Sequence, residues 1–163
     1  MGHLHLDHAG GLEHFLDTDV PIIVHEEEFE HACWAVATGA DLGVYHGHYM
    51  LLEKLNWQTF TDSTLEIYQG ITLHHSPGHT PGLCLMQVNR EKDGTFIWTT
   101  DQFHVADNYE KGHPHGGLPR DHTAWYRSLN MVRRLQRLYN ARLIFGHDKV
   151  VAEQLMAEKP YFH

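Results

Sequence analysis

The sequence contains little cysteine, little positive charge and no long apolar run, and each shortage argues against a class of protein. The two cysteines, Cys33 and Cys84, form no CxxC pattern, so they predict small buried side chains in a reducing compartment. No stretch approaches the roughly 20 consecutive apolar residues of a membrane-spanning helix. The 12 basic and 21 acidic side chains give a formal net charge of −9, which disfavours nucleic acid and anionic membranes as partners.

The start of the chain also lacks the basic segment and the apolar run of a signal peptide, so we expect a cytoplasmic location. The chain has 163 residues, of which 42% are hydrophobic and 20% are charged. This size and composition are typical of a globular protein with a buried core. We therefore expect residues 1–163 to form a single domain.

Apolar periodicity and turn residues predict strands that alternate with helices. Strands are expected at residues 21–24, 64–68, 71–75, 83–88, 95–100 and 142–145. Helices are expected at residues 26–38, ended by Gly39, at 49–55, at 122–139 with Asp121 as the cap, and at 150–158. Residues 103–120 are polar and rich in glycine, proline and histidine, which predicts a long loop. Strands with helices between them indicate an α/β layered fold.

Histidine is abundant, with 17 residues against 12 lysines and arginines, and four potential metal ligands lie together near the N-terminus. They form the HxHxDH pattern of His3, His5, Asp7 and His8, which two glycines follow at positions 10 and 11. On an extended segment His3 and His5 project to one side, so both can bind one ion. After a turn, Asp7 and His8 can face a second ion. The alternative is a chance cluster, which four ligands within six residues disfavour.

Three more candidate ligands follow predicted strands. His79 lies in the turn SPGHTPG, Asp101 ends the strand FIWTT, and His147 follows the strand LIFG. Each residue alone is also compatible with a capping or surface role. Because α/β folds gather their sites at the carboxyl ends of strands, the shared placement favours one common site, where Asp101 can bridge two ions.

These motifs together resemble the metallo-β-lactamase superfamily, and they are most similar to its N-acyl homoserine lactonase-like branch. The resemblance runs in order through HxHxDHxGG, SPGHTPG, the strand ending in aspartate, and FGHD, from His3 to Asp148. It implies an αβ/βα sandwich and two divalent metal ions, usually zinc, with manganese, iron or cobalt as alternatives. It also implies one ion held by His3, His5 and His79, a second held by Asp7, His8 and His147, and Asp101 as the bridging ligand.

The implied activity is the opening of a lactone by a hydroxide that bridges the two metals. Asp7 would orient this nucleophile and pass its proton to the leaving oxygen. Three alternatives stay open: a cyclic amide or carbamate hydrolase, a thioesterase of the glyoxalase II type, and a truncated metal-binding protein without activity. No GxSxG motif is present to suggest a serine nucleophile.

The sequence departs from the lactonase pattern at position 104, where the branch commonly has a tyrosine that assists the substrate carbonyl. A neutral His104 can donate the same hydrogen bond, which makes it a catalytic candidate; the alternative is an ordinary loop histidine. Tyr109 and His122 are secondary candidates. The 103–120 loop, which contains His113 and His115, is a candidate substrate lid.

Other histidines have simpler interpretations. His46 and His48 are expected in a solvated turn. His74 and His75 should lie on opposite faces of one strand, so at most one of them can approach the metal site.

A second departure concerns the N-terminus, since domains of this branch have a long segment before HxHxDH, whereas the motif here begins at residue 3. We therefore expect the fold to be N-terminally truncated and to lack its first strands. Exposed strand edges and apolar helix faces would then favour a homo-oligomer or a partner chain that covers the sheet.

Overall fold

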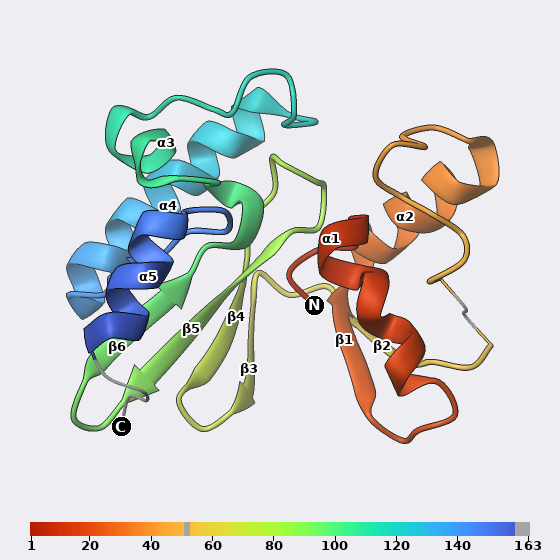
Figure 1. Cartoon of the computed structure of the whole chain (residues 1–163), viewed down its shortest axis with the longest axis horizontal. Coiled ribbons are helices and arrows are strands. Elements are labelled where there is room, and N and C mark those ends of the chain that lie inside the picture. The colour runs from red at the N-terminus through yellow and green to blue at the C-terminus, as the bar shows by residue number, and fades with distance from the viewer. Residues whose placement is uncertain (51–52, 159–163) are drawn as a thin grey trace.

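The computed structural model describes residues 1–50 and 53–158, which fold into two packed units (Figure 1). The first, the two-stranded unit, contains α1 (Leu6–Ala9), the 3-10 helix Gly10–Phe15, α2 (Glu26–Thr38) and the parallel strands β1 (Pro21–His25) and β2 (Asn56–Phe60). The second, the five-stranded unit, contains one mixed sheet and three helices. This is the mixed α/β layering that the sequence predicts.

The five-stranded sheet has the order β3-β4-β5-β6-β7. Its strands are β3 (Thr64–Tyr68), β4 (Ile71–His75), β5 (Cys84–Arg90), β6 (Gly94–Trp98) and β7 (Arg142–Ile144). Neighbours are antiparallel except β6 and β7, which are parallel and joined through the helices α3 (Ala106–Lys111) and α4 (His122–Tyr139). The helix α5 (Lys149–Glu158) follows β7.

Helix α4 covers the five-stranded sheet with one apolar face. Trp125, Leu129 and Val132, spaced by three and four residues, are buried against Leu85 and Ile97 of the sheet. The helix begins at the predicted cap, since the Asp121 side chain accepts a hydrogen bond from the Ala124 amide at 2.9 Å. Farther along the predicted stripe, Leu138 is 73% exposed, so burial ends before the last turn of the helix.

A separate apolar core lies in the two-stranded unit, where α2 packs on β1 and on the N-terminal segment. Its buried residues include Leu4, Leu12, Val24 and Ala32. Helix α2 ends as predicted, because Gly39 adopts the left-handed conformation with φ 74°.

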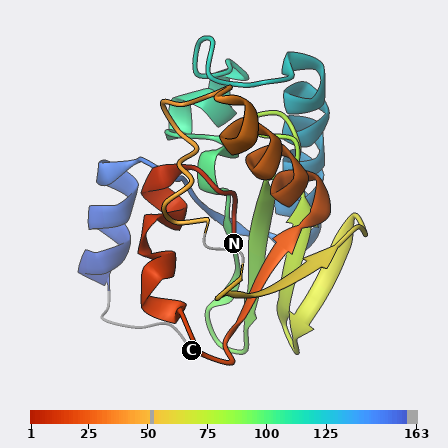
Figure 2. The same cartoon turned by 90° about the vertical axis from the view of Figure 1, so that its right-hand side faces the viewer.

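The turn between β4 and β5, residues 76–83, connects the two units by lying between α2 and α4, as two views at right angles show (Figure 1, Figure 2). The buried carboxylate of Glu28 on α2 accepts hydrogen bonds from the amides of Leu4 at 2.9 Å and Gly82 at 3.2 Å, and from the Tyr45 hydroxyl at 3.0 Å. A Cβ atom at Gly82 would lie 2.1 Å from the Glu28 amide nitrogen, so only glycine permits this approach. Glu28 thereby holds the N-terminal segment and the turn together.

All the predicted strands are present, and their ends differ from the predicted ends by at most two residues. The predicted helices that correspond to α2, α4 and α5 are present too. Two predictions need correction. Residues 103–120 are not a continuous loop, because α3 forms within them. The predicted helix at 49–55 is wrong where it can be checked: residues 49, 50 and 53–55 form turns or irregular chain, and 51–52 lie outside the described residues.

The strand β2 was not anticipated, although its five residues pair in register with β1. Within the described residues, no helix is long and apolar enough to cross a lipid bilayer.

Candidate metal centre

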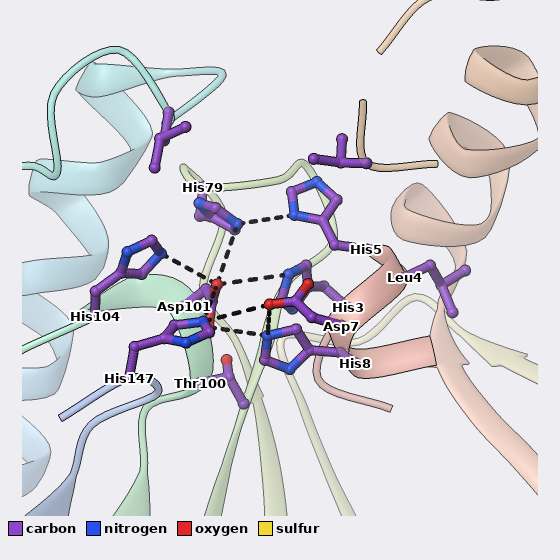
Figure 3. A network of polar contacts seen from close by, with 12 residues as sticks. His3, Leu4, His5, Asp7, His8, His79, Thr100, Asp101, His104 and His147 are labelled. Atoms are coloured by element: carbon purple, nitrogen blue, oxygen red, sulfur yellow. Dashed lines mark hydrogen bonds and ion pairs between the residues drawn. The ribbon is translucent and has the colours of Figure 1, made fainter. Parts of the chain in front are cut away.

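All seven predicted ligands converge where the two units meet (Figure 3). Four come from the N-terminal segment and α1, and the other three come from the segments that follow three strands of the larger sheet. They form two groups whose candidate ligand atoms lie within 4.8 Å of one another. The groups are His3, His5 and His79, and Asp7, His8, Asp101 and His147.

The first group is a buried cluster of three imidazoles. His3, His5 and His79 are each at most 4% exposed, and their rings meet edge to face with centroids 4.5–5.0 Å apart. The Nε2 atom of His79 lies 3.1 Å from the Nδ1 atom of His5. Burial lowers the pKa of His5 to about 4 and that of His79 to about 2, and it also lowers the pKa of His3. All three rings are therefore neutral at neutral pH, which is the form that binds a metal.

The second group surrounds the carboxylate of Asp101, which is 3% exposed. His8 Nε2 lies 3.1 Å from Asp101 Oδ1, and His147 Nε2 lies 3.1 Å from Asp101 Oδ2. Asp7 Oδ2 lies 3.5 Å from the Nε2 atoms of both histidines. Asp101 Oδ2 also lies 3.7 Å from His79 Nε2, so this carboxylate stands between the two groups, where a bridging ligand would have to be.

Local backbone features place Asp101 and His147 beside each other. Asp101 lies in a 3-10 turn, Thr100–Gln102, directly after β6, and His147 follows the neighbouring β7. A Cβ atom at Gly146 would lie 2.5 Å from the Thr100 carbonyl oxygen and 2.6 Å from Asp101 Oδ1. Because Gly146 has no side chain, the chain after β7 can pass against Asp101 and present His147 to it.

The electrostatics of the cluster favour an ionised Asp101. Burial acts to raise the pKa of this carboxyl group, but the hydrogen bonds from His104 and His8 and the nearby His3 outweigh burial and hold its pKa well below the ordinary value. Burial also acts to lower the pKa of His8, and here the bond to Asp101 prevails and raises it.

The cluster contains buried imidazole nitrogens without a hydrogen-bond partner in the described residues, among them His3 Nδ1, His3 Nε2 and His5 Nε2. Buried polar groups in proteins are normally paired, so unpaired nitrogen lone pairs in such a cluster fit cations. Imidazole nitrogens and carboxylate oxygens together suit zinc and similar divalent ions. The residues present therefore fit a pair of divalent metals.

A cavity of about 240 Å³ opens beside the cluster. Its lining residues are His5, Asp7, Val44, His79, Asp101, His104, Leu118, Arg120 and His147. The cavity thus brings together candidate ligands, two aliphatic side chains and one guanidinium group, which is an arrangement able to hold a small organic molecule next to the metals.

His104 lies in the cluster, with its Nε2 atom 3.1 Å from Asp101 Oδ2. The two secondary candidates lie elsewhere. The Tyr109 hydroxyl donates to the Gln136 side chain, and its ring packs on Phe103 in the core. His122 is exposed at the start of α4.

The remaining histidines behave largely as predicted. His48 is exposed beside His46 in a turned segment. His74 is buried and bonds to the Gln87 side chain at 3.0 Å, whereas His75 stacks on His25.

His25, His75 and Glu27 form another group of possible metal ligands, apart from the main cluster. The two imidazole rings are stacked, with centroids 3.7 Å apart and an interplanar angle of 10°. Because lone pairs lie in the ring planes, parallel rings do not direct them to one point. His25 Nδ1 already accepts from the Glu27 amide at 3.3 Å, and His75 Nε2 bonds to the Pro81 carbonyl at 2.9 Å. We interpret this group as packing around the start of α2.

One residue of the cluster carried no specific role in the sequence analysis. His115, from the segment between α3 and α4, places Nε2 3.0 Å from His79 Nδ1 and stacks its ring on His104. No local pattern distinguishes it from the exposed His113, so the fold was needed to find it.

Comparisons with known proteins agree with this geometry. The family model described as metallo-beta-lactamase superfamily matches residues 3–147. The chain is 31% identical over 149 residues to an N-acyl homoserine lactonase from Bacillus sp, covering 90% of this chain and 53% of that protein. It is 28% identical over 155 residues to N-acyl homoserine lactonase AiiB from Agrobacterium fabrum, covering 91% and 55%. The chain thus spans about half the length of these relatives.

A solved structure of an N-acyl homoserine lactone hydrolase, with N-hexanoyl-L-homoserine bound at its catalytic metal centre, superposes with a TM-score of 0.81. The two chains are 27% identical, and the match covers 99% of this chain and 59% of the other.

Proposed function

Because the chain belongs to the metallo-β-lactamase superfamily, we propose that it forms the metal-binding part of a hydrolase that opens a lactone, a cyclic ester. The observation that carries this proposal is the position of Asp101: its Oδ1 lies 3.1 Å from His8 of one ligand group, and its Oδ2 lies 3.7 Å from His79 of the other, beside one cavity. Such a paired arrangement suits a reaction in which one oxygen atom attacks a carbonyl carbon while another leaves it.

We propose that His3, His5 and His79 hold one divalent cation, that Asp7, His8 and His147 hold the second, and that Asp101 binds both. Zinc is the metal that we expect, because the ligands are imidazoles and carboxylates. When bound, such a pair supplies Lewis acidity and a water molecule that is deprotonated near neutral pH.

Asp7 is suited to proton transfer because its side chain is 57% exposed while its carboxylate faces the cavity. In lactone opening, a water oxygen forms a bond to the carbonyl carbon and the ring C–O bond breaks. Asp7 would orient the water, accept its proton and deliver that proton to the departing alkoxide oxygen. Asp7 is then a carboxylate again, so it has gained and lost one proton over the reaction.

His104 is placed to bind the substrate carbonyl. Its ring lines the cavity, and its Nε2 atom lies 3.1 Å from Asp101 Oδ2. With Asp101 binding the cations, this N–H would be free to donate a hydrogen bond to the carbonyl oxygen as negative charge develops on it. This is the role that the resemblance to lactonases implies for position 104.

The cavity supports a small-molecule substrate, with Val44 and Leu118 as apolar walls. The related hydrolase holds N-hexanoyl-L-homoserine at its metal centre, so N-acyl homoserine lactones are the first substrates to test. The experiment is a rate comparison of the zinc-loaded chain on N-hexanoyl-homoserine lactone, a simple γ-lactone and a glutathione thioester. We expect the lactones to be opened, and the Asp101→Ala variant to be inactive. Hydrolysis of the thioester alone would instead support the glyoxalase II alternative.

The single domain over residues 1–163 and the association with a second copy or a partner chain stay predictions. Exposed apolar side chains such as Trp34 (53%) and Leu42 (64%) are compatible with association. Light scattering coupled to size-exclusion chromatography measures the oligomeric state directly.

A further inference from the structure

His115 contacts two residues of the cluster at once. Its Nε2 atom lies 3.0 Å from Nδ1 of His79, on the side of that ring opposite the other ligands. Its ring is also stacked on His104, with centroids 3.9 Å apart and an interplanar angle of 17°. His115 is partly buried although it belongs to an irregular segment.

We propose that His115 is a positioning residue of the metal centre, which accepts a hydrogen bond from His79 Nδ1–H and thereby directs the unprotonated Nε2 of His79 toward the cation. This inference rests on the proposed function, because it assumes that His79 is a metal ligand.

The geometry fixes which nitrogen of His79 must carry the proton. His79 Nε2 faces His5 Nδ1 at 3.1 Å and Asp101 Oδ2 at 3.7 Å, so this nitrogen is the one directed into the ligand cluster. A ligating nitrogen must be unprotonated, and a neutral imidazole then carries its proton on the other nitrogen. The His79 Nδ1–H bond therefore points at His115 Nε2. A partner on the outer nitrogen fixes both the tautomer and the ring orientation of a metal-binding histidine.

The position of His115 is itself held by the preceding segment. The His113 amide donates to the Asn108 carbonyl at 3.1 Å, and the Asn108 side chain donates to the His113 carbonyl at 3.0 Å. These bonds anchor the segment to the end of α3 and place His115 over the cluster.

The test compares zinc affinity, measured by competition with a chromogenic chelator, in the native chain and three variants. His115→Ala removes the acceptor, and we expect zinc binding about 10- to 100-fold weaker. His115→Gln retains a side-chain oxygen that can accept from His79, and it should restore most of the affinity. His113→Ala is the matched control, since this exposed residue bonds to Asn108 through its backbone, and its affinity should equal that of the native chain.

A second readout needs no metal. Long-range proton–nitrogen spectra of the imidazole rings report which nitrogen of His79 carries the proton. We expect Nδ1–H in the native chain and His115→Gln, and a mixture of tautomers in His115→Ala. This measurement also shows whether His115→Ala is still folded.

The outcomes separate the two proposals. Tight zinc binding that is equal in the native chain and His115→Ala would overturn the role of His115 and leave the metal centre standing. A native chain that binds no zinc would overturn the proposed function. The metal-free tautomer measurement would then test His115 by itself, and an unchanged His79 tautomer in His115→Ala would refute the positioning role of His115.

Discussion

The carboxylate of Glu28 accepts a hydrogen bond from the Gly82 amide at 3.2 Å, and this bond fixes the turn that carries His79 to helix α2. The same carboxylate accepts from the Leu4 amide, whose neighbours His3 and His5 are candidate ligands. One buried side chain outside the metal cluster thus aligns two of the segments that build it.

Glu28→Ala should therefore destabilise the protein. It would leave two buried amides and the Tyr45 hydroxyl without their acceptor, and we expect a loss of about 2–5 kcal/mol in the free energy of unfolding. Urea denaturation measures this loss. Glu30→Ala, at an exposed position of the same helix, should change stability by less than about 0.5 kcal/mol. Equal stability of the two variants would contradict the role of Glu28.

Asp101→Ala should abolish tight binding of both metals, because this carboxylate is the ligand that we propose the two cations share. Elemental analysis after dialysis against metal-free buffer measures the metal content per chain. Asp107→Ala removes an exposed aspartate that pairs with Lys111, and it should leave the metal content unchanged. Two tightly held metals in the Asp101 variant would refute the bridging assignment.

The metal-free protein should lose stability as the pH falls below about 6.5. Burial lowers the folded-state pKa of His5 to about 4 and that of His79 to about 2, from the ordinary histidine value of about 6.5, so the unfolded chain binds more protons between these values. Stability then decreases with acidification by roughly 1.4 kcal/mol per pH unit for each such histidine. The raised pKa of His8 acts in the opposite direction, since its contribution is lost as the pH rises.

Urea midpoints of chelator-treated protein between pH 7.5 and pH 5 test this dependence. A His5→Gln variant should show a shallower slope over the same range. If the free energy of unfolding stays constant or rises on acidification, the histidine cluster does not determine its pH dependence.

His104→Tyr should keep the metals and change the turnover of lactones. The substitution restores the side chain that lactonases of this branch commonly have, and a tyrosine hydroxyl can donate to a carbonyl oxygen as an imidazole can. Steady-state rates on a series of lactones, with metal content measured in parallel, test the role. Rates that equal those of the native chain on every substrate would remove His104 from the mechanism.

Those parts of the fold that depend on local signals could be predicted from the sequence. Helix α2 is flanked by a strand and by Gly39, and Asp121 caps α4, so both helices begin and end where the residues indicate. The seven candidate ligands could be proposed for a similar reason, because each lies in a short motif or directly after an apolar strand.

Features that depend on distant parts of the chain could not be predicted. The strand β2 exists because it pairs with β1, which lies much earlier in the sequence. Helix α3 is short and has no buried residue, so no apolar periodicity marks it. His115 looks like its neighbour His113 until the fold brings His79 beside it.

The candidate ligands of each group lie far apart in the sequence, since the first group joins His3 to His79 and the second joins His8 to His147. A bound cation would then act as a removable cross-link that closes a long loop in the unfolded chain and lowers its entropy. Because binding free energy adds to folding free energy, the loaded protein should unfold as one cooperative unit. Stripping the metal would weaken the attachment of the N-terminal segment to the five-stranded sheet, so loss of metal should make that segment more sensitive to proteases.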